Sequence, residues 1–329
     1  MMSALLKVEN LTTEFKTSKG AFVAVNDVSF DVKEGEVVGL VGESGCGKSV
    51  TSLSIMGLLP GRISKITGGS ITFEGKELTK LSPKEFRKIR GKDIAMIFQE
   101  PMTSLNPVYT IGYQIGEVLK NHTNLSKNEI KEKTVDILKR VGIPRAEAVL
   151  DQYPHQFSGG MRQRAMIAMA IACGPKLLIA DEPTTALDVT IQAQILELLK
   201  KLAAEEHMAI ILITHDLGVV AEMCDRVMVM YAGHIVEEAG VVEFFKHPGH
   251  PYSKGLIECI PKLGMGDKVL PSIPGYVPHP SDITPGCRFY SRCAVSGDRC
   301  KDNMPSFVPM GEGHKCRCWQ FGEGGEAVV

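Results

Sequence analysis

The sequence VVGLVGESGCGKSVTSL, residues 37–53, is the strongest indication of the fold. Val37 to Val41 form an apolar run that is typical of a buried strand. The next eight residues read G-E-S-G-C-G-K-S, which is the phosphate-binding P-loop pattern. Glycines let successive backbone N–H groups turn inward, and the helix that follows presents its positive end to a phosphate. A chance glycine-rich turn is the alternative, but the complete match between a strand and a helix favours a nucleotide-binding α/β domain.

Two side chains of this loop suit the chemistry of a bound nucleotide. Lys48 supplies a point charge for the terminal phosphates, and the hydroxyl of Ser49 suits magnesium. Cys46 occupies a variable position of the pattern, so we assign it no metal role.

Length and composition limit the classes of protein that this chain can belong to. The 329 residues suggest two domains, or one large domain with an appendage. The formal net charge of −1 gives no reason to expect nucleic-acid binding, and the basic stretch PKEFRKIRGK is typical of a solvated helix face. No run of about 18 apolar residues occurs, and the start MMSALLKVEN lacks the features of a signal peptide. We therefore expect a cytosolic protein.

A second site is predicted at GPKLLIADEPTTALD, residues 174–188. Leu177 to Ala180 read as another buried strand, which delivers Asp181 and Glu182 at its end. An acid there can bind a magnesium-coordinated water, and a second acid can orient or deprotonate the attacking water. Alone, this pattern is often just the end of a strand. Together with the P-loop, it indicates phosphoryl transfer.

A third motif lies between these two, in HQFSGGMRQRAMIAMAIACGP, residues 155–175. Ser158 can cap a helix that runs to about Cys173. A plain capped amphipathic helix is one interpretation. The two glycines in the first turn argue for close approach of another group to the backbone, and a phosphate at the helix start is the obvious candidate.

The P-loop, FSGGMRQR, LLIADEP, ALD and ITHD, in that order, resemble the nucleotide-binding subunit of an ABC transporter, from about Leu6 to Glu243. The resemblance implies that Ser158 to Gly160 grip ATP bound to the opposite subunit. It assigns catalysis to Glu182, His215 and Gln99, and magnesium to Ser49, Gln99 and Asp181. The residues expected at the subunit's own ATP are Phe15 on the adenine, Gly42, Ser44, Gly45, Cys46, Gly47, Lys48, Ser49 and Thr51. Those expected at the opposite subunit's ATP are Ser158, Gly159, Gly160 and Asp188.

The family also implies a domain plan. Residues 1–245 would form the ATPase domain, with an inserted helical subdomain at about 100–157 that docks against a membrane permease. Residues 246–329 would form a C-terminal extension with a cysteine motif. Because the chain has one P-loop, two composite ATP sites require a second subunit, which the family favours as a paralogue over an identical copy.

Two further stretches narrow the choice of transporter. FQEPMTSLNP, residues 98–107, and HPGHPYSKGLIECIP, residues 247–261, resemble the dipeptide and oligopeptide importers and their nickel-importing relatives. We expect an ATPase subunit, peripheral on the cytoplasmic face of the membrane, that powers peptide uptake with two permeases and an extracytoplasmic peptide-binding protein. Uptake of nickel or another small solute is the alternative. A soluble ABC ATPase acting on nucleic acid or ribosomes, or an export motor, is disfavoured by these stretches.

Five cysteines are crowded near the end of the chain: Cys287, Cys293, Cys300, Cys316 and Cys318. In a reducing compartment they favour metal or redox chemistry over disulfides. Their spacing is wider than the usual zinc knuckle, so zinc is open but not favoured. A set of reduced thiols is the other alternative. The family resemblance implies a [4Fe–4S] cluster on Cys287, Cys293, Cys300 and Cys318, with Cys316 as the alternative fourth ligand.

Overall fold

A computed structural model describes residues 4–18, 20–99, 104–185, 187–261, 271–279 and 285–322. The chain forms two compact units, each built from segments that are separate in the sequence. One unit comprises residues 33–36 and 80–213, and the other comprises residues 4–32, 37–79 and 214 onwards. The second unit therefore contains both the P-loop and the cysteine-rich C-terminal segment. Part of FQEPMTSLNP, Ala186 of the ALD motif, and parts of the proline-rich run before Cys287 lie outside the described residues.

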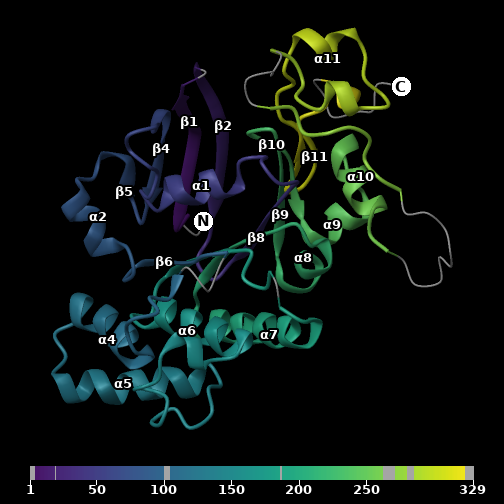
Figure 1. Cartoon of the computed structure of the whole chain (residues 1–329). Helices are drawn as coiled ribbons and strands as arrows, with labels where there is room; N and C mark the ends of the chain where they lie inside the picture. Colours follow the sequence, from purple (N-terminus) through teal and green to yellow (C-terminus); the bar gives the residue numbers. More distant parts are fainter. Residues whose placement is uncertain are drawn as a thin grey trace. The chain divides into compact units, whose positions relative to one another are not determined.

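The unit of residues 80–213 is built on three parallel strands. Strand β7 pairs with β6 on one side and with β8 on the other, and nearly all of their side chains are buried. Such continuous apolar runs are typical of parallel strands. Helix α4 packs on α5 and α6, and these helices lie together in the teal region (Figure 1). The elements are η1 Leu78–Lys80, α2 Pro83–Ile89, β6 Ile94–Ile97, α4 Ile111–His122, α5 Lys127–Arg140, η2 Pro154–Gln156, α6 Gly159–Ile171, β7 Leu177–Asp181, α7 Val189–Glu206 and β8 Ala209–Thr214.

Polar side chains fix where the helices of this unit begin. Ser82 and Ser126 each form a capping box with a glutamate three residues later. Ser158 caps α6 by accepting a hydrogen bond from the Met161 N–H, and Asp188 caps α7 by accepting one from the Ile191 N–H. Helix α6 ends at Ile171, close to the end predicted from the sequence. These caps place the first turns of α6 and α7 at defined points of the chain.

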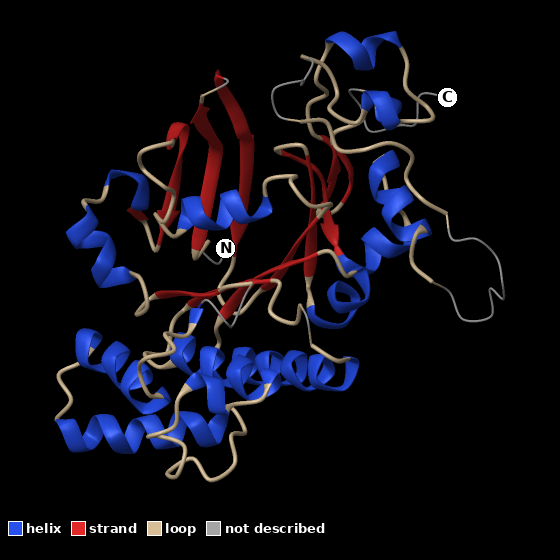
Figure 2. Cartoon of the chain, in the orientation of Figure 1, coloured by secondary structure: helices blue, strands red, loops and turns tan. Residues whose placement is uncertain are grey.

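The other unit combines an antiparallel sheet with a mixed one, whose strands are red in Figure 2. The first sheet has the order β2-β1-β4-β5, and the strands of the second run β11-β12-β10-β9-β3, with β3 parallel to β9. All five residues of β3 are buried, as predicted, and β3 leads into the P-loop and α1. The elements are β1 Leu6–Thr17, β2 Gly20–Val32, β3 Val37–Val41, α1 Lys48–Ile55, β4 Ser64–Phe73, β5 Lys76–Glu77, α8 Leu217–Met223, β9 Arg226–Tyr231, β10 His234–Gly240, α9 Val241–Lys246, α10 Pro251–Glu258, η3 Tyr290–Arg292, α11 Asp298–Asp302, β11 Val308–Gly311, β12 His314–Cys316 and η4 Trp319–Phe321.

A buried carboxylate joins the C-terminal segment to the second sheet. Strand β12 pairs with β10, and Glu237 lies opposite Cys316 in that register. The fully buried Glu237 accepts hydrogen bonds from the N–H groups of Gly249 and His250, each at 2.7 Å, and contacts His314 Nε2 at 2.9 Å. Charged and hydrogen-bonded partners of this kind are needed to bury an ionised group. Glu237 thus connects β10, the start of α10 and β12.

Within the described part of the chain, none of the helices has the length and apolar content needed to cross a bilayer.

The burial of two histidines should make the free energy of unfolding depend on pH. Burial lowers the pKa of His234 to about 3 and that of His250 to about 4. In an unfolded chain a histidine has a pKa of about 6.5, so the unfolded state binds more protons than the folded state below that pH. The free energy of unfolding should therefore fall as the pH drops from 6.5 towards 4.5, by up to about 1.4 kcal/mol per pH unit for each histidine.

Urea denaturation between pH 7.5 and 4.5 measures this loss. The His250→Asn variant keeps a side-chain acceptor for the Tyr252 N–H and should show a shallower decline. A transition midpoint that does not move over this range would contradict the assignment of both histidines as neutral.

Candidate functional site

The P-loop, residues 42–49, joins β3 to α1 in a conformation that requires glycine. Gly42, Gly45 and Gly47 all have positive φ, at 153°, 79° and 109°. A Cβ on Gly42 would lie 2.1 Å from the Met230 carbonyl oxygen, and one on Gly47 would lie 2.9 Å from the Ala24 carbonyl oxygen. The loop is therefore packed against strand β9 and strand β2, and no side chain fits at either position.

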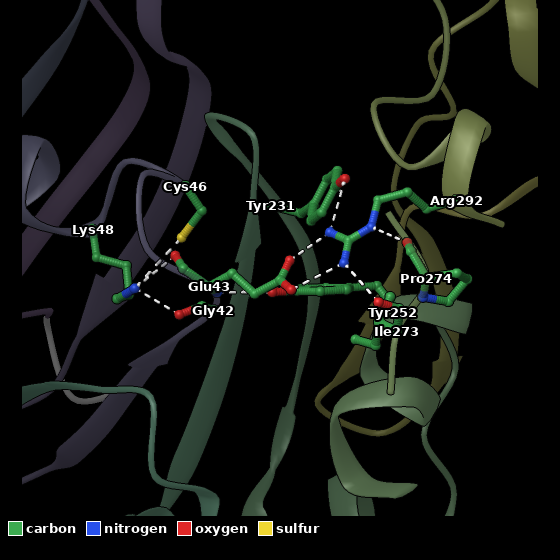
Figure 3. Close-up of polar contacts among 9 residues, drawn as sticks. All are labelled: Gly42, Glu43, Cys46, Lys48, Tyr231, Tyr252, Ile273, Pro274 and Arg292. Atoms are coloured by element: carbon green, nitrogen blue, oxygen red, sulfur yellow. Dashed lines mark hydrogen bonds and ion pairs between the residues drawn. The ribbon is translucent and has the colours of Figure 1, made fainter. Parts of the chain in front are cut away.

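Lys48, the first residue of α1, is buried inside this loop (Figure 3). Its Nζ donates to the carbonyl oxygens of Gly42, at 2.6 Å, and Glu43, at 3.0 Å. Cys46 is also buried, and burial raises the pKa of its thiol, with the Lys48 charge opposing that effect. The Thr51 hydroxyl is bonded to the Gly47 carbonyl at 3.0 Å. A lysine ammonium enclosed by a glycine-rich loop at the start of a helix is the arrangement that binds phosphate.

His215 lies near the start of the P-loop. A cavity of about 360 Å³ is lined by Gly42 and Glu43, by His215 with the following residues, and by Leu256 and Cys259 of the C-terminal segment. Asp216 caps α8 by accepting a hydrogen bond from the Gly218 N–H at 2.8 Å. His215 therefore opens onto the same space as the first residues of the loop.

Phe15, predicted to stack on adenine, is on β1 opposite Phe22 of β2. The two rings are stacked, with centroids 5.8 Å apart and an interplanar angle of 11°. Both rings are partly exposed, so the pair forms an aromatic surface on this sheet.

The strand-end residues of the other unit form a second group. Gln99 follows β6, and its Nε2 donates to Glu182 Oε2 at 2.9 Å. The Thr185 hydroxyl donates to the same oxygen at 2.8 Å. Glu182 has a φ of 46°, an uncommon backbone conformation for a residue with a side chain. The structure therefore brings together Gln99 and Glu182, which the sequence predicts as catalytic, with Asp181 buried just before them at the end of β7.

The signature motif is in the same unit, at the start of α6. A Cβ on Gly160 would lie 2.9 Å from Ile191 Cγ2 of α7, so the glycine allows α6 to approach α7 closely. Gln163, which is buried on α6, donates to the Pro183 carbonyl. Ser158 and Asp188 cap these two helices, as described above, and the signature is thus tied to the segment that follows Glu182.

In addition to burial, the pKa of Cys287 is raised by three of the other clustered cysteines, and that of Cys316 is raised by Cys287 and Cys318. Burial raises the pKa of Cys287 to about 11, and charges on Cys300, Cys318 and Cys293 raise it further. Cys316 differs, because it is fully buried on β12, and burial followed by the charge of Glu237 raises its pKa. Among the residues that the structure describes, no group of three or more His, Cys, Asp or Glu side chains is arranged to hold a metal ion. The cluster therefore stays a prediction.

Sequence reasoning missed the contacts of Glu43. Its carboxylate pairs with Arg292, and its N–H donates to the Tyr252 hydroxyl (Figure 3). Glu43 occupies a variable position of the P-loop, and both partners follow more than 200 residues later, so no local pattern links them.

Comparison with known proteins identifies the class of protein to which this chain belongs. The family model described as ABC transporter matches residues 25–185, and the one described as oligopeptide/dipeptide transporter, C-terminal region, matches residues 236–300. Among solved structures, the ATP-binding cassette MJ0796, in a dimeric post-hydrolysis state bound to ADP and Pi, is 30% identical with a TM-score of 0.65. The alignment covers 72% of this chain and 98% of that one. The fold and the P-loop define an ABC-type ATPase.

Two curated relatives extend the likeness over the whole chain. The oligopeptide transport ATP-binding protein AppD of Bacillus subtilis is 53% identical, over 98% of this chain and 99% of that protein. The dipeptide transport ATP-binding protein DppD of Escherichia coli is 50% identical, over 96% of both. This chain belongs to the family of ABC-transporter ATP-binding proteins that carry the oligopeptide/dipeptide transporter C-terminal region, which confirms the resemblance drawn from its motifs.

Glu182 generates a direct prediction. Glu182→Gln should lower kcat for ATP hydrolysis by about 10²–10⁴-fold, because the variant lacks the carboxylate that is predicted to orient or deprotonate the attacking water. ATP binding should be retained, since the P-loop is unchanged. Phosphate release and equilibrium ATP binding measure the two effects.

Glu197→Gln, on the exposed face of α7, is the matched control. ATP turnover in Glu182→Gln equal to that of the control would show that Glu182 has no catalytic role.

Proposed function

We propose that this chain is the ATP-hydrolysing motor subunit of an ABC importer that takes up di- or oligopeptides across the cytoplasmic membrane. The observation that carries the proposal is the combination of a P-loop ATPase with the oligopeptide/dipeptide transporter C-terminal region in one chain. Relatives named for oligopeptide and dipeptide transport match nearly the whole chain. Nickel import by the same motor is the alternative, and an uptake experiment with both solutes distinguishes it from peptide import.

Residues of the P-loop unit would bind ATP. The buried Lys48 ammonium supplies charge for the terminal phosphates. The glycines with positive φ, which have no side chains, let the phosphates approach the backbone closely. Phe15, with Phe22, offers an aromatic face for adenine. Other residues of this subunit's own ATP site would be Gly42, Ser44, Gly45, Cys46, Gly47, Ser49 and Thr51.

The acidic strand end would carry the chemistry. Asp181, Gln99 and Ser49 supply oxygen ligands of the kind that Mg²⁺ prefers, and a bound Mg²⁺ would neutralise charge on the phosphates. Glu182, held by Gln99 and Thr185, would orient or deprotonate the attacking water. His215, which opens onto the cavity beside Gly42, would contact the γ-phosphate.

A second ABC subunit would complete the assembly. Ser158, Gly159, Gly160 and Asp188 would contact the ATP of that subunit, because a capped helix start offers free N–H groups to a phosphate. The ATPase domain would comprise residues 1–245, and the helical region at about 100–157 would dock on the permeases. An extracytoplasmic peptide-binding protein would deliver the solute.

The C-terminal extension, residues 246–329, would hold a [4Fe–4S] cluster on Cys287, Cys293, Cys300 and Cys318. Two observations support this ligand set. Cys293, Cys300 and Cys318 lie close enough to Cys287 to raise its pKa, and the Cys287 N–H is bonded to the Cys300 carbonyl at 2.7 Å. Cys316 is the poorer candidate, because it is buried against Glu237 in the β10–β12 pair. Once bound, a cluster would cross-link a segment too small to build its own core.

Purification from membranes tests the motor assignment. The full chain, tagged and expressed together with the proposed permease and second ATPase subunits, should co-purify with two membrane-spanning permeases and hydrolyse ATP. Co-purification with RNA or ribosomes instead would support a soluble ABC ATPase and contradict the proposal.

Metal analysis of anaerobically purified protein tests the cluster. We expect about four irons with matching acid-labile sulfide per chain. Cys318→Ser should lose iron, while Cys316→Ser should retain it.

A content of one zinc per chain without sulfide would contradict the cluster and indicate a structural zinc site instead. Equal iron loss in both serine variants would contradict the choice of Cys318.

A further inference from the structure

Glu43, the second residue of the P-loop, is held by the C-terminal segment of the chain (Figure 3). The Arg292 guanidinium contacts both carboxylate oxygens of Glu43, Nη1 to Oε2 at 2.5 Å and Nη2 to Oε1 at 3.0 Å. This two-bond geometry is the strongest arrangement of an arginine–carboxylate pair. It fixes the orientation of the Glu43 side chain as well as its position.

The same segment also holds the Glu43 backbone. The Glu43 N–H donates to the Tyr252 hydroxyl at 2.8 Å, and Tyr252 is fully buried on α10. The Glu43 carbonyl accepts from Lys48 Nζ at 3.0 Å. All three polar groups of this residue are therefore engaged, two of them by residues from the C-terminal segment and one by the lysine expected at the phosphates.

Arg292 is itself rigidly placed. Its Nε donates to the Pro274 carbonyl at 2.8 Å, and its side chain is only 3% exposed. The guanidinium carbon lies 5.8 Å from the centres of both the Tyr231 and Phe289 rings. Tyr231 packs edge-on against Tyr252, with ring centroids 4.7 Å apart, so the two residues that hold Glu43 share one aromatic support. The Glu43 side chain is 32% exposed, so water screens the pair only in part.

The position of Glu43 matters because Gly42 and Glu43 supply the carbonyl oxygens that hold Lys48. Phosphate binding needs the lysine and the loop N–H groups to be fixed before the nucleotide arrives. We propose that Arg292 and Tyr252 are positioning residues for ATP, which act through Glu43 to hold the P-loop in its nucleotide-binding conformation. This inference rests on the proposed function, in which this loop is the ATP site.

The proposal gives the C-terminal segment a part in ATP binding. The residue after Arg292 is Cys293, so this side chain links the cysteine-rich segment to the P-loop. Neither Arg292 nor Tyr252 needs to touch the nucleotide for this effect.

The test uses the full chain and separates affinity from turnover. Arg292→Lys keeps a charge but loses the two-bond geometry, and Tyr252→Phe removes the hydroxyl that accepts from the Glu43 N–H. Both should raise KM and Kd for ATP, by about tenfold for Arg292→Lys, within the range typical of coupling between sites. The change in kcat should be much smaller. Arg299→Ala is the control, because Arg299 lies in the same segment but packs over the Trp319 ring at 3.6 Å.

A second pair of variants covers the case in which Arg292→Lys does not fold. Glu43→Gln changes the loop side alone and should raise KM to a similar extent. Combining Glu43→Arg with Arg292→Glu should restore part of the affinity that each single reversal loses, which a general loss of stability would not do.

Values of KM and Kd within twofold of the control for both Arg292→Lys and Glu43→Gln would overturn the proposal. So would a double reversal no better than either single one. If the wild-type chain binds no ATP, the assignment of the ATP site itself is wrong. This outcome needs no variant, so it is distinguishable from failure of the Arg292 proposal.

Discussion

The backbone of the P-loop has no room for a side chain where it passes β9 and β2, and the nucleotide site depends on this constraint. A Cβ at Gly42 or Gly47 would overlap a neighbouring carbonyl oxygen. Only glycine permits so close an approach, and the resulting turn places carbonyl oxygens around the Lys48 ammonium. The loop has little freedom of its own, so a contact that fixes Glu43 also fixes the lysine.

The acidic group at the end of β7 follows a different rule. Buried parallel strands end in polar residues at one edge, and the Glu182 carboxylate is held there by Gln99 and Thr185. The strained backbone of Glu182 is of the kind that persists only where surrounding contacts determine it. Gln99 and Glu182 are 83 residues apart in sequence but hydrogen-bonded in the structure.

Much of this could be predicted from the sequence, and the physical reason is locality. The strand at Val37–Val41, the cap at Ser158 and the strand before Glu182 each depend on neighbouring residues, and the structure confirms them. The Arg292–Glu43 pair and the contacts of the buried Glu237 could not be predicted. Their partners come from distant segments of the chain, so no fixed spacing in the sequence links them. In the cysteine-rich segment the sequence pattern points to the thiols, whereas the structure shows that an arginine of this segment contacts the P-loop.

ATP hydrolysis by this chain should drive peptide uptake. The most direct measurement is the uptake of a radiolabelled dipeptide, and of radioactive nickel, in a strain that lacks this chain and is complemented with wild type or Lys48→Ala. We expect that wild type restores dipeptide uptake, that Lys48→Ala does not, and that nickel uptake is the same throughout. Dipeptide uptake that is unaffected by loss of the chain, with nickel uptake lost instead, would contradict this expectation.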